Sequence, residues 1–273
     1  MRIARFTAGT DDPRFGVVEG LAADGGLDEA FVAVVDGDPL YRPIQFTGER
    51  VPLLDARLLA PVIPRSKIVG IGRNYAEHAA ELGHDVASTP LMFLKPNTSV
   101  LGPQDNVVLP RQSHEVHHEA ELAVVIGRIC KDVPRERAAE VVFGYTCADD
   151  VTARDLQRSD GQWARAKGFD TFCPLGPWLS TVLDPSDLGV RCRVNGELRQ
   201  DGRTSQMVHD VPALVAAVSS AFTLLPGDVL LTGTPAGVGP VSDGDRVEIE
   251  IEGIGTLRHG VVAERTLAND EEE

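Results

Sequence analysis

The stretch that most constrains the fold is residues 117–127, His117-His118-Glu119-Ala120-Glu121-Leu122-Ala123-Val124-Val125-Ile126-Gly127. Its short apolar run ends at a glycine, a pattern that predicts a buried β-strand. Successive strand side chains point to opposite faces, so Glu119 and Glu121 should share one face with Ala123 and Val125. Carboxylates this close repel each other unless one is protonated or a cation neutralises them. A hard divalent metal is one such partner, and an edge strand with two solvated glutamates is the alternative.

The composition is that of an ordinary globular protein. The chain has 273 residues, of which 42% are hydrophobic and 25% are charged, enough for one large domain or two unequal ones. A formal net charge of −15 argues against a nucleic-acid partner, because phosphate binding needs a basic surface. We find no secretory signal and no apolar segment long enough to span a bilayer, so we expect a soluble, cytoplasmic protein that does not bind membranes.

The punctuation of the chain predicts its domains. Residues 1–63 contain short strand-like runs between Gly- and Asp-rich turns, and Pro61 and Pro64 mark a join. We predict a small N-terminal α/β domain over residues 1–63, a main domain over 64–265 and a disordered acidic tail over 266–273. Strands outnumber long helices, so a strand-dominated α+β fold with an antiparallel or mixed sheet fits better than a doubly wound one.

Several elements can be predicted from periodicity and turn residues. We expect strands at residues 67–72, 141–147, 228–232 and 246–252, the last with alternating Val or Ile and Glu. Residues 76–82 form a short helical pattern, residues 149–157 resemble a helix start, and residues 205–222 form the clearest amphipathic helix. The four separated cysteines predict reduced thiols rather than disulfides or a zinc site.

Asp150 is a third candidate carboxylate, at the junction between a predicted buried strand and a predicted helix start. A side chain at such a junction can face a cavity, but an Asp at a helix N-terminus usually caps the helix and favours its dipole. Capping and metal binding both stay open here, and Asp149 competes for either role.

His78 and Glu81 lie three residues apart in a predicted helix, so their side chains are neighbours. A carboxylate that hydrogen-bonds an imidazole orients it and raises its basicity, which suits a general base that activates water. A surface pair of little consequence is the commoner arrangement at this spacing.

Two lysines and a glycine-rich loop complete the candidates. Lys167 lies in an apolar stretch, where it either snorkels or meets an anionic ligand, whereas Lys95 beside Pro96 is expected to be a surface charge. The loop at residues 233–239 lacks the Gly-Lys-Ser/Thr ending of a phosphate loop. Its glycines are expected instead to let the backbone and Thr234 approach a small ligand closely.

Together these segments resemble the fumarylacetoacetate hydrolase family, a group of metal-dependent enzymes that act on 2-oxo acids. The resemblance runs from about residue 67 to residue 259 and rests on five blocks in order: residues 72–78, 119–121, 150–155, 167–177 and 233–239. It implies a fold like the C-terminal domain of that family, a mixed β-sandwich or roll, preceded by a small N-terminal domain. It also implies a homodimer.

The resemblance implies roles for individual residues. Glu119, Glu121 and Asp150 would bind Mg²⁺ or Mn²⁺, with Ca²⁺ as a stand-in in a crystal. His78 and Glu81 would activate water on a segment that acts as a lid, and Lys167 would stabilise developing charge. Substrate contacts would come from Arg154, Gln157, Lys167 and Thr234.

The function that follows is metal-dependent hydrolysis of a C–C bond in a 2,4-dioxo acid, such as an acylpyruvate or a fumarylacetoacetate-like substrate, through a metal-stabilised enolate. Isomerisation of 2-hydroxyhepta-2,4-diene-1,7-dioate or 5-carboxymethyl-2-hydroxymuconate, and decarboxylation of oxaloacetate, stay open as alternatives. A non-catalytic binding protein would be expected to lack a ligand or the His–Glu pair, and a structural protein would expose Glu119 and Glu121. The sequence does not specify which 2-oxo acid binds.

Overall fold

The apolar run after Glu119 forms β11 (Ala120–Ile126), in which every residue is buried. The computed structural model describes residues 1–9, 12–22, 26–81, 83 and 88–265. In it β11 pairs antiparallel with β12 (Val142–Asp149) on one side and with β17 (Val229–Leu231) on the other. β11 is therefore an interior strand, and an exposed edge position for Glu121 is excluded.

Within the described residues, the largest sheet contains twelve strands, most of them on one path. In sheet order the path runs β4 (Phe46–Pro52), β3 (Phe31–Val35), β2 (Arg14–Glu19), β1 (Arg2–Ala8), β14 (Cys173–Ser180), β12, β11, β17, β6 (Ile68–Gly72) and β7 (Leu91–Lys95). Off this path, β5 (Ala56–Leu59) pairs with β1 and β8 (Val100–Leu101) pairs with β14. Pairing is antiparallel except at β17–β6 and β14–β8, so the sheet is mixed, as predicted.

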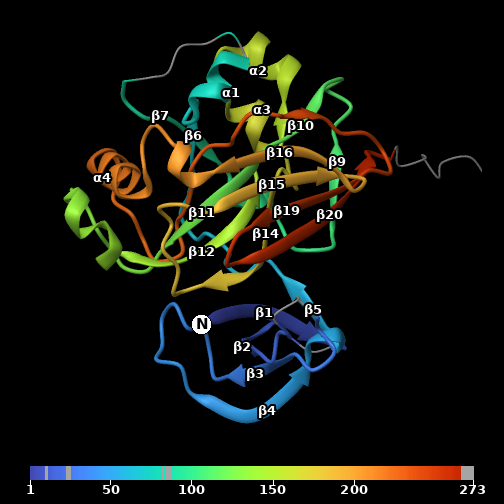
Figure 1. Cartoon of the computed structure of the whole chain (residues 1–273), viewed down its shortest axis with the longest axis vertical. Coiled ribbons are helices and arrows are strands. Elements are labelled where there is room, and N and C mark those ends of the chain that lie inside the picture. Colours follow the sequence, from blue (N-terminus) through green and yellow to red (C-terminus); the bar gives the residue numbers. More distant parts are fainter. Residues whose placement is uncertain (10–11, 23–25, 82, 84–87, 266–273) are drawn as a thin grey trace, which may run out of the picture.

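A five-stranded sheet packs across β11, β12 and β14, which gives the sandwich its second layer (Figure 1). Its order is β16 (Glu197–Arg203), β15 (Gly189–Val194), β19 (Arg246–Ile251), β20 (Gly255–Ala263) and β9 (Asn106–Leu109). A separate three-stranded sheet has the strand order β13 (Thr152–Ala153), β10 (Val116–His118) and β18 (Gly239–Pro240).

The alternation predicted for residues 246–252 is confirmed in β19. Val247, Ile249 and Ile251 are buried in the main core, while Glu248 and Glu250 are only partly buried. Leu122 of β11 belongs to the same core, so apolar residues from both sheets fill the space between them.

The N-terminal segment contains strands and no α-helix among its described residues. It contains β1 to β5 and a short 3-10 helix (Leu53–Asp55), so the helical part of the predicted α/β composition is wrong. The reason is visible in the sequence, where apolar runs of strand length alternate with Gly and Asp turns. Antiparallel pairing of Arg2 and Ile3 with Ser180 and Leu179 joins this segment to β14, and Figure 1 shows it as a separate lobe of the same sheet. The domain limits stay a prediction.

The helices are short. They are α1 (Ala76–Glu81), α2 (Arg154–Asp160), α3 (Ala164–Gly168) and α4 (Val211–Ala221), with further 3-10 turns at Asn97–Ser99, Arg135–Glu140 and Thr204–Gln206. α1, α2 and α3 gather at the end of the molecule opposite the N-terminal lobe (Figure 1). None of the described helices has the length and hydrophobicity needed to cross a bilayer.

One predicted helix start is wrong and another is confirmed. The helix expected from residue 205 begins at Val211, because the side chain of Asp210 accepts a hydrogen bond from Ala213 N–H and caps it there. The helix start expected within residues 149–157 is confirmed at Arg154, after Thr152 and Ala153 pair with β10 as a strand.

The four cysteines are free thiols, three of them buried. The acidic tail predicted over residues 266–273, and Leu82 at the end of the predicted helix 76–82, lie outside the described residues.

The cap on α4 makes a testable contribution to stability. Replacing Asp210 with Ala (Asp210→Ala) removes the acceptor for Ala213 N–H and should lower the free energy of unfolding by about 1 kcal/mol. Asp210→Asn is the matched control: it keeps a capping acceptor and loses only the exposed ion pair with Arg135, which should matter little. Urea denaturation should rank the wild type and Asp210→Asn together above Asp210→Ala; equal midpoints for all three would contradict the assignment.

Candidate metal centre and active site

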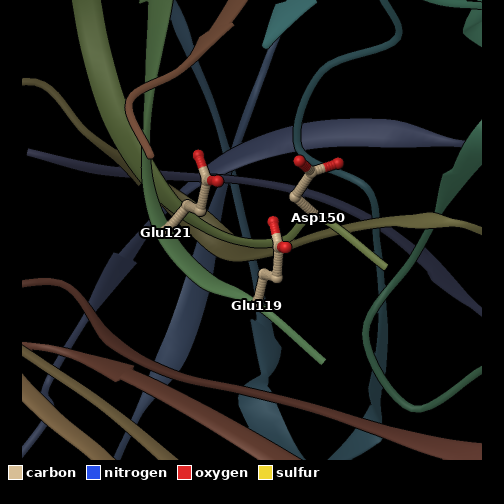
Figure 2. Close-up of side chains that lie close together, drawn as sticks. All are labelled: Glu119, Glu121 and Asp150. Atoms are coloured by element: carbon tan, nitrogen blue, oxygen red, sulfur yellow. The ribbon is translucent and has the colours of Figure 1, made fainter. Parts of the chain in front are cut away.

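Three carboxylates meet at the carboxyl end of β12 and the start of β11. Candidate ligand oxygens of Glu119, Glu121 and Asp150 all lie within 4.8 Å of one another. The three residues are between 1% and 3% exposed, and Figure 2 shows their carboxylates close together and extending into the same region. The alternative of solvated surface glutamates is therefore excluded.

Asp150 does not cap a helix. Its Oδ1 accepts a hydrogen bond from Lys95 Nζ at 2.5 Å, and its Oδ2 accepts one from Lys167 Nζ at 2.5 Å. α2 begins only at Arg154 and has no side-chain cap. The question that the sequence left open is thus decided against capping, and the side chain faces the other two carboxylates.

Lys95 corrects the sequence analysis. It was expected to be a surface charge, yet it is 2% exposed, and its ammonium also donates to the Phe172 carbonyl at 2.7 Å. Lys167 is buried too and donates to Glu119 Oε2 at 2.7 Å as well as to Asp150. Arg154 donates to Glu119 Oε1 at 2.5 Å. Three buried cations therefore surround two of the three carboxylates.

Glu121 is the carboxylate left without a cation. Within the described residues it forms no hydrogen bond or ion pair with a Lys, Arg or His, and its Oε2 accepts one hydrogen bond, from Gly233 N–H at 2.7 Å. Burial, then the negative charges of Asp150 and Glu119, raise the pKa of Glu121 well above its usual range. Burial also opposes ionisation of Glu119, but Lys167 and Arg154 outweigh it and lower the pKa of that group.

The chemistry and the charge of these residues suit a divalent metal ion. The donor set is three carboxylates, the oxygen ligands that Mg²⁺, Mn²⁺ and Ca²⁺ prefer. A divalent cation bound among them would give Glu121 the positively charged partner that it lacks among the described residues. The residues fit the predicted ion, and metal binding stays a prediction.

Glu119 lies between the end of β10 and the start of β11, and its backbone N–H is bound by a side chain. Glu119 N–H donates to Asp149 Oδ1 at 2.7 Å, and Asp149 Oδ2 lies 2.9 Å from Nε2 of the buried His259. Ala120 N–H donates to Gln200 Oε1 at 2.9 Å. Asp149 therefore positions the backbone of a neighbouring candidate ligand, a role that the sequence did not predict.

Gln200 of β16 is fully buried, and both the oxygen and the nitrogen of its side-chain amide form hydrogen bonds. Its Oε1 also lies 3.1 Å from His118 Nδ1, while its Nε2 donates to Thr234 Oγ1 at 2.7 Å and to the Pro235 carbonyl at 2.8 Å. Thr234 Oγ1 in turn donates to the Ala120 carbonyl at 2.8 Å. Gln200 thus joins the Glu-Ala-Glu segment to the glycine-rich loop, and no local sequence pattern signals it.

A cavity of about 370 Å³ opens onto this cluster. Of the predicted residues, it is lined by His78, Glu119, Glu121, Arg154, Gln157, Lys167 and Thr234. The wall also includes residues that the sequence analysis did not select: Ile71, Gly72, Arg73, Arg158, Gly161 and Trp163. Asp150 and Glu81 are not part of the wall and contact it through Lys167 and His78.

The His–Glu pair forms within α1. His78 Nδ1 lies 3.3 Å from Glu81 Oε2, and the imidazole is almost fully buried while Glu81 is about one-third exposed. Burial lowers the pKa of His78, more strongly than the nearby Glu119 raises it. The backbone N–H of Gly237 donates to both Glu81 oxygens, at 3.2 and 3.3 Å, so Glu81 also ties α1 to the glycine-rich loop.

That loop needs glycine at its first position. Gly233 has φ +94°, and a Cβ there would lie 2.7 Å from the Cβ of Asn74. Its N–H is the donor to Glu121, so the close approach of this backbone also serves the carboxylate cluster.

Comparison with known proteins gives a consistent family assignment. The family model described as Fumarylacetoacetate (FAA) hydrolase C-terminal matches residues 67–262, and the one described as Rv2993c-like, N-terminal, matches residues 1–61. The mitochondrial oxaloacetate tautomerase FAHD2A of Homo sapiens is 48% identical over 224 residues, which cover 78% of this chain and 71% of that protein.

Two solved structures extend the comparison. The 2-hydroxyhepta-2,4-diene-1,7-dioate isomerase of Mycobacterium marinum has a TM-score of 0.89 and 48% identity. The maleylpyruvate hydrolase of Sphingobium sp. SYK-6, solved in complex with manganese (II) ion and pyruvate, has a TM-score of 0.78 and 37% identity. Each covers 97% of this chain and all of the neighbour's chain.

The charge imbalance at Glu121 predicts a specific metal response. Glu121→Gln mimics the protonated carboxyl, so the metal-free variant should melt at the wild-type temperature or above. The rise in Tm with Mg²⁺ or Mn²⁺, corresponding to about 2.7 kcal/mol at a hundredfold excess over Kd, should be lost. Differential scanning fluorimetry checks both, with Glu197→Gln on exposed β16 surface as the control. An undiminished metal-induced rise in Glu121→Gln would exclude Glu121 as a ligand.

The hydrogen bonds of Gln200 predict an effect on metal affinity. Gln200→Met has similar volume but makes none of the four contacts, so Glu119 and Glu121 lose a support of their shared backbone. Groups that orient metal ligands typically change metal affinity 10- to 100-fold, so the Mn²⁺ Kd should rise by about that factor. Paramagnetic resonance of free Mn²⁺ measures it. Val194→Ala, which loosens the same sheet elsewhere, should leave Kd unchanged; equal Kd for Gln200→Met would show that Gln200 is not needed.

Proposed function

The chain belongs to the fumarylacetoacetate hydrolase family, and from this premise we propose that it hydrolyses a C–C bond in a 2,4-dioxo acid with the help of Mg²⁺ or Mn²⁺. The observation that carries the proposal is the cavity itself. Glu119 and Glu121 of the buried carboxylate cluster, a buried lysine and an imidazole with a lowered pKa all face one space of about 370 Å³, and Asp150 contacts this space through Lys167. Membership alone would not separate hydrolysis from other reactions, whereas a water-activating group favours it.

Glu119, Glu121 and Asp150 would hold the ion, whose contribution is to polarise the keto oxygen of the 2-oxo acid. Lys167 lies against the same carboxylates and would stabilise negative charge as it develops on the substrate. Gln157 accepts a hydrogen bond from Arg154 at 3.0 Å with Oε1, so its NH₂ group is the donor left for a substrate carboxylate. Because the Thr234 hydroxyl proton is used by the Ala120 carbonyl, Thr234 would donate through its backbone N–H.

His78 would be the base. Nδ1 faces Glu81, so the neutral tautomer that donates from Nδ1 leaves Nε2 free to accept a proton from water. Its pKa is lowered by burial, so the imidazole is unprotonated at neutral pH, as the role requires. The Glu81–Gly237 contact keeps α1 against the loop and would limit bulk water during reaction.

The bond changes then balance. Water loses a proton to His78 Nε2, and its oxygen bonds to the distal carbonyl carbon. The bond between that carbon and its neighbour breaks, and the electron pair moves into the 2-oxo acid fragment as an enolate. A proton returned from His78 to the enolate carbon yields the free 2-oxo acid, and the other product is a carboxylic acid.

Isomerisation or tautomerisation is the second candidate. It is favoured by the names of two relatives, an oxaloacetate tautomerase and a diene-dioate isomerase. Such reactions need proton transfer at carbon next to the keto group, which His78 could also perform without activating water. The homodimer and the cytoplasmic location implied by the sequence stay predictions.

A substrate panel with two variants tests the proposal. With Mg²⁺, the wild type should release pyruvate from acetylpyruvate, and His78→Ala should lower kcat about 100- to 10,000-fold. Activity should fall with decreasing pH as His78 takes up a proton, with a midpoint below 6.5. Glu81→Gln removes a contact that raises the pKa of His78, so the midpoint should move further down.

The reaction class is read from the products. Pyruvate release is followed with a coupled dehydrogenase, while loss of enol absorbance from oxaloacetate without a change in mass reports tautomerisation. Enol loss without any pyruvate release would favour the second candidate. Wild-type turnover by a folded His78→Ala protein would exclude His78 as the base for either reaction.

A further inference from the structure

We propose that Arg73 binds a second carboxylate at the far end of the substrate, so that dicarboxylic 2-oxo acids are preferred to those with a neutral tail. The inference rests on the proposed function, because it requires the 2-oxo acid end to bind over the carboxylate cluster. Arg73 lines the cavity that opens onto this cluster.

The other cations of the cavity wall are already paired. Arg154 contacts Glu119, Lys167 contacts Glu119 and Asp150, and Arg158 contacts Glu115. Arg73, in contrast, makes no hydrogen bond or ion pair within the described residues. A guanidinium has five N–H donors in a planar fork that matches a carboxylate, so Arg73 has the capacity to bind an anion that enters the cavity.

Arg73 is placed toward the mouth of the cavity. Glu119 and Glu121 are almost fully buried, whereas Arg73 and Trp163 are each partly exposed. The guanidinium carbon of Arg73 lies 5.9 Å from the centroid of the Trp163 ring, which gives the charged group an aromatic support. On this proposal, a 2-oxo acid bound at the floor extends its other end past Trp163 toward Arg73.

Glycine at position 72 makes this support possible. A Cβ at Gly72 would lie 2.5 Å from Cζ3 of Trp163, so any larger residue would push the indole away from the cavity wall. The absence of a side chain lets Trp163 pack against the backbone that leads directly into Arg73. Phe93 packs on the same ring at 5.6 Å between centroids, with the planes at 64°.

The backbone of Arg73 is fixed in a conformation that non-glycine residues rarely adopt, with φ 59°. The next residue keeps it there. Asn74 is buried, its Nδ2 donates to the carbonyls of Thr232 at 2.7 Å and His209 at 2.9 Å, and its Oδ1 accepts from His209 N–H at 2.9 Å. Left-handed residues held this firmly cluster at functional sites, and here the constraint determines where the Arg73 side chain leaves the chain.

A terminal carboxylate is the substrate group that this position recognises best. It would form charge-assisted hydrogen bonds with Arg73, and a neutral alkyl end would form none while displacing water from the guanidinium. Hydrogen bonds to charged groups of this kind correspond to about a 10- to 100-fold difference in affinity. The cationic mouth would thus select diacids, while the floor performs the chemistry.

The test compares ligands that differ only at the far end. Two matched pairs suit it: 2-oxoglutarate with 5-methyl-2-oxohexanoate, and 2-oxoadipate with 6-methyl-2-oxoheptanoate. Isothermal calorimetry on the Mg²⁺-loaded protein should give Kd values about 10- to 100-fold lower for the diacid in at least one pair. Arg73→Met should remove this preference, and Arg73→Lys should retain part of it. Arg165→Met is the matched control, because Arg165 is exposed, paired with Asp160 and outside the cavity; it should keep the full preference.

Pyruvate separates the two levels of the proposal, since it has the 2-oxo acid end but no far end. Its Kd should be the same in the wild type and Arg73→Met, which also shows that the variant keeps an intact site. Pyruvate binding with no diacid preference in the wild type, or a preference that survives in Arg73→Met, would overturn the role of Arg73 alone. Failure of pyruvate to bind the Mg²⁺-loaded wild type would overturn the proposed function and this inference with it.

Discussion

The burial of the Glu121 carboxylate is the constraint on which the rest of the site depends. An isolated ionised group inside a protein is strongly disfavoured, and here it lies beside two further carboxylates in the middle of a sheet. Lys95, Lys167 and Arg154 form ion pairs with Asp150 and Glu119, whereas Glu121 forms none within the described residues. The cluster thus contains one carboxylate, that of Glu121, without an ion-pair partner among the described residues. Its pKa is raised by burial and by the two neighbouring negative charges.

Holding such a cluster in place requires more than the β-ladder. Glu119 lies between β10 and β11, and side chains from distant parts of the chain accept hydrogen bonds from its N–H and from the N–H of Ala120. The second sheet contributes Gln200 from β16 and His259 from β20, the latter acting through Asp149. The five-stranded layer is therefore both the partner of a hydrophobic core and a support for the polar groups that orient the carboxylates.

These contacts explain what could be predicted from the sequence. The Glu119–Glu121 pair was readable because the alternation of a strand is local, and the His78–Glu81 pair because helical spacing is local. Lys95 was not, because the groups that bury it, Asp150 and the Phe172 carbonyl, are 55 and 77 residues away.

The role of Gln200 could not be predicted for the same reason, because Gln200 is 80 residues from Ala120 in the sequence. The apolar spacing that predicted a helix from residue 205 begins before the true helix start. The start is set by the cap at Asp210 rather than by the periodicity. On the proposed function, the floor of the cavity, with its paired cations and carboxylates, would suit several reactions that begin by polarising a keto group. Relatives named for hydrolysis, isomerisation and tautomerisation fit that generality. On the proposed role of Arg73, what distinguishes one such enzyme from another would lie where the floor ends, in side chains whose hydrogen-bonding capacity is not consumed by the fold.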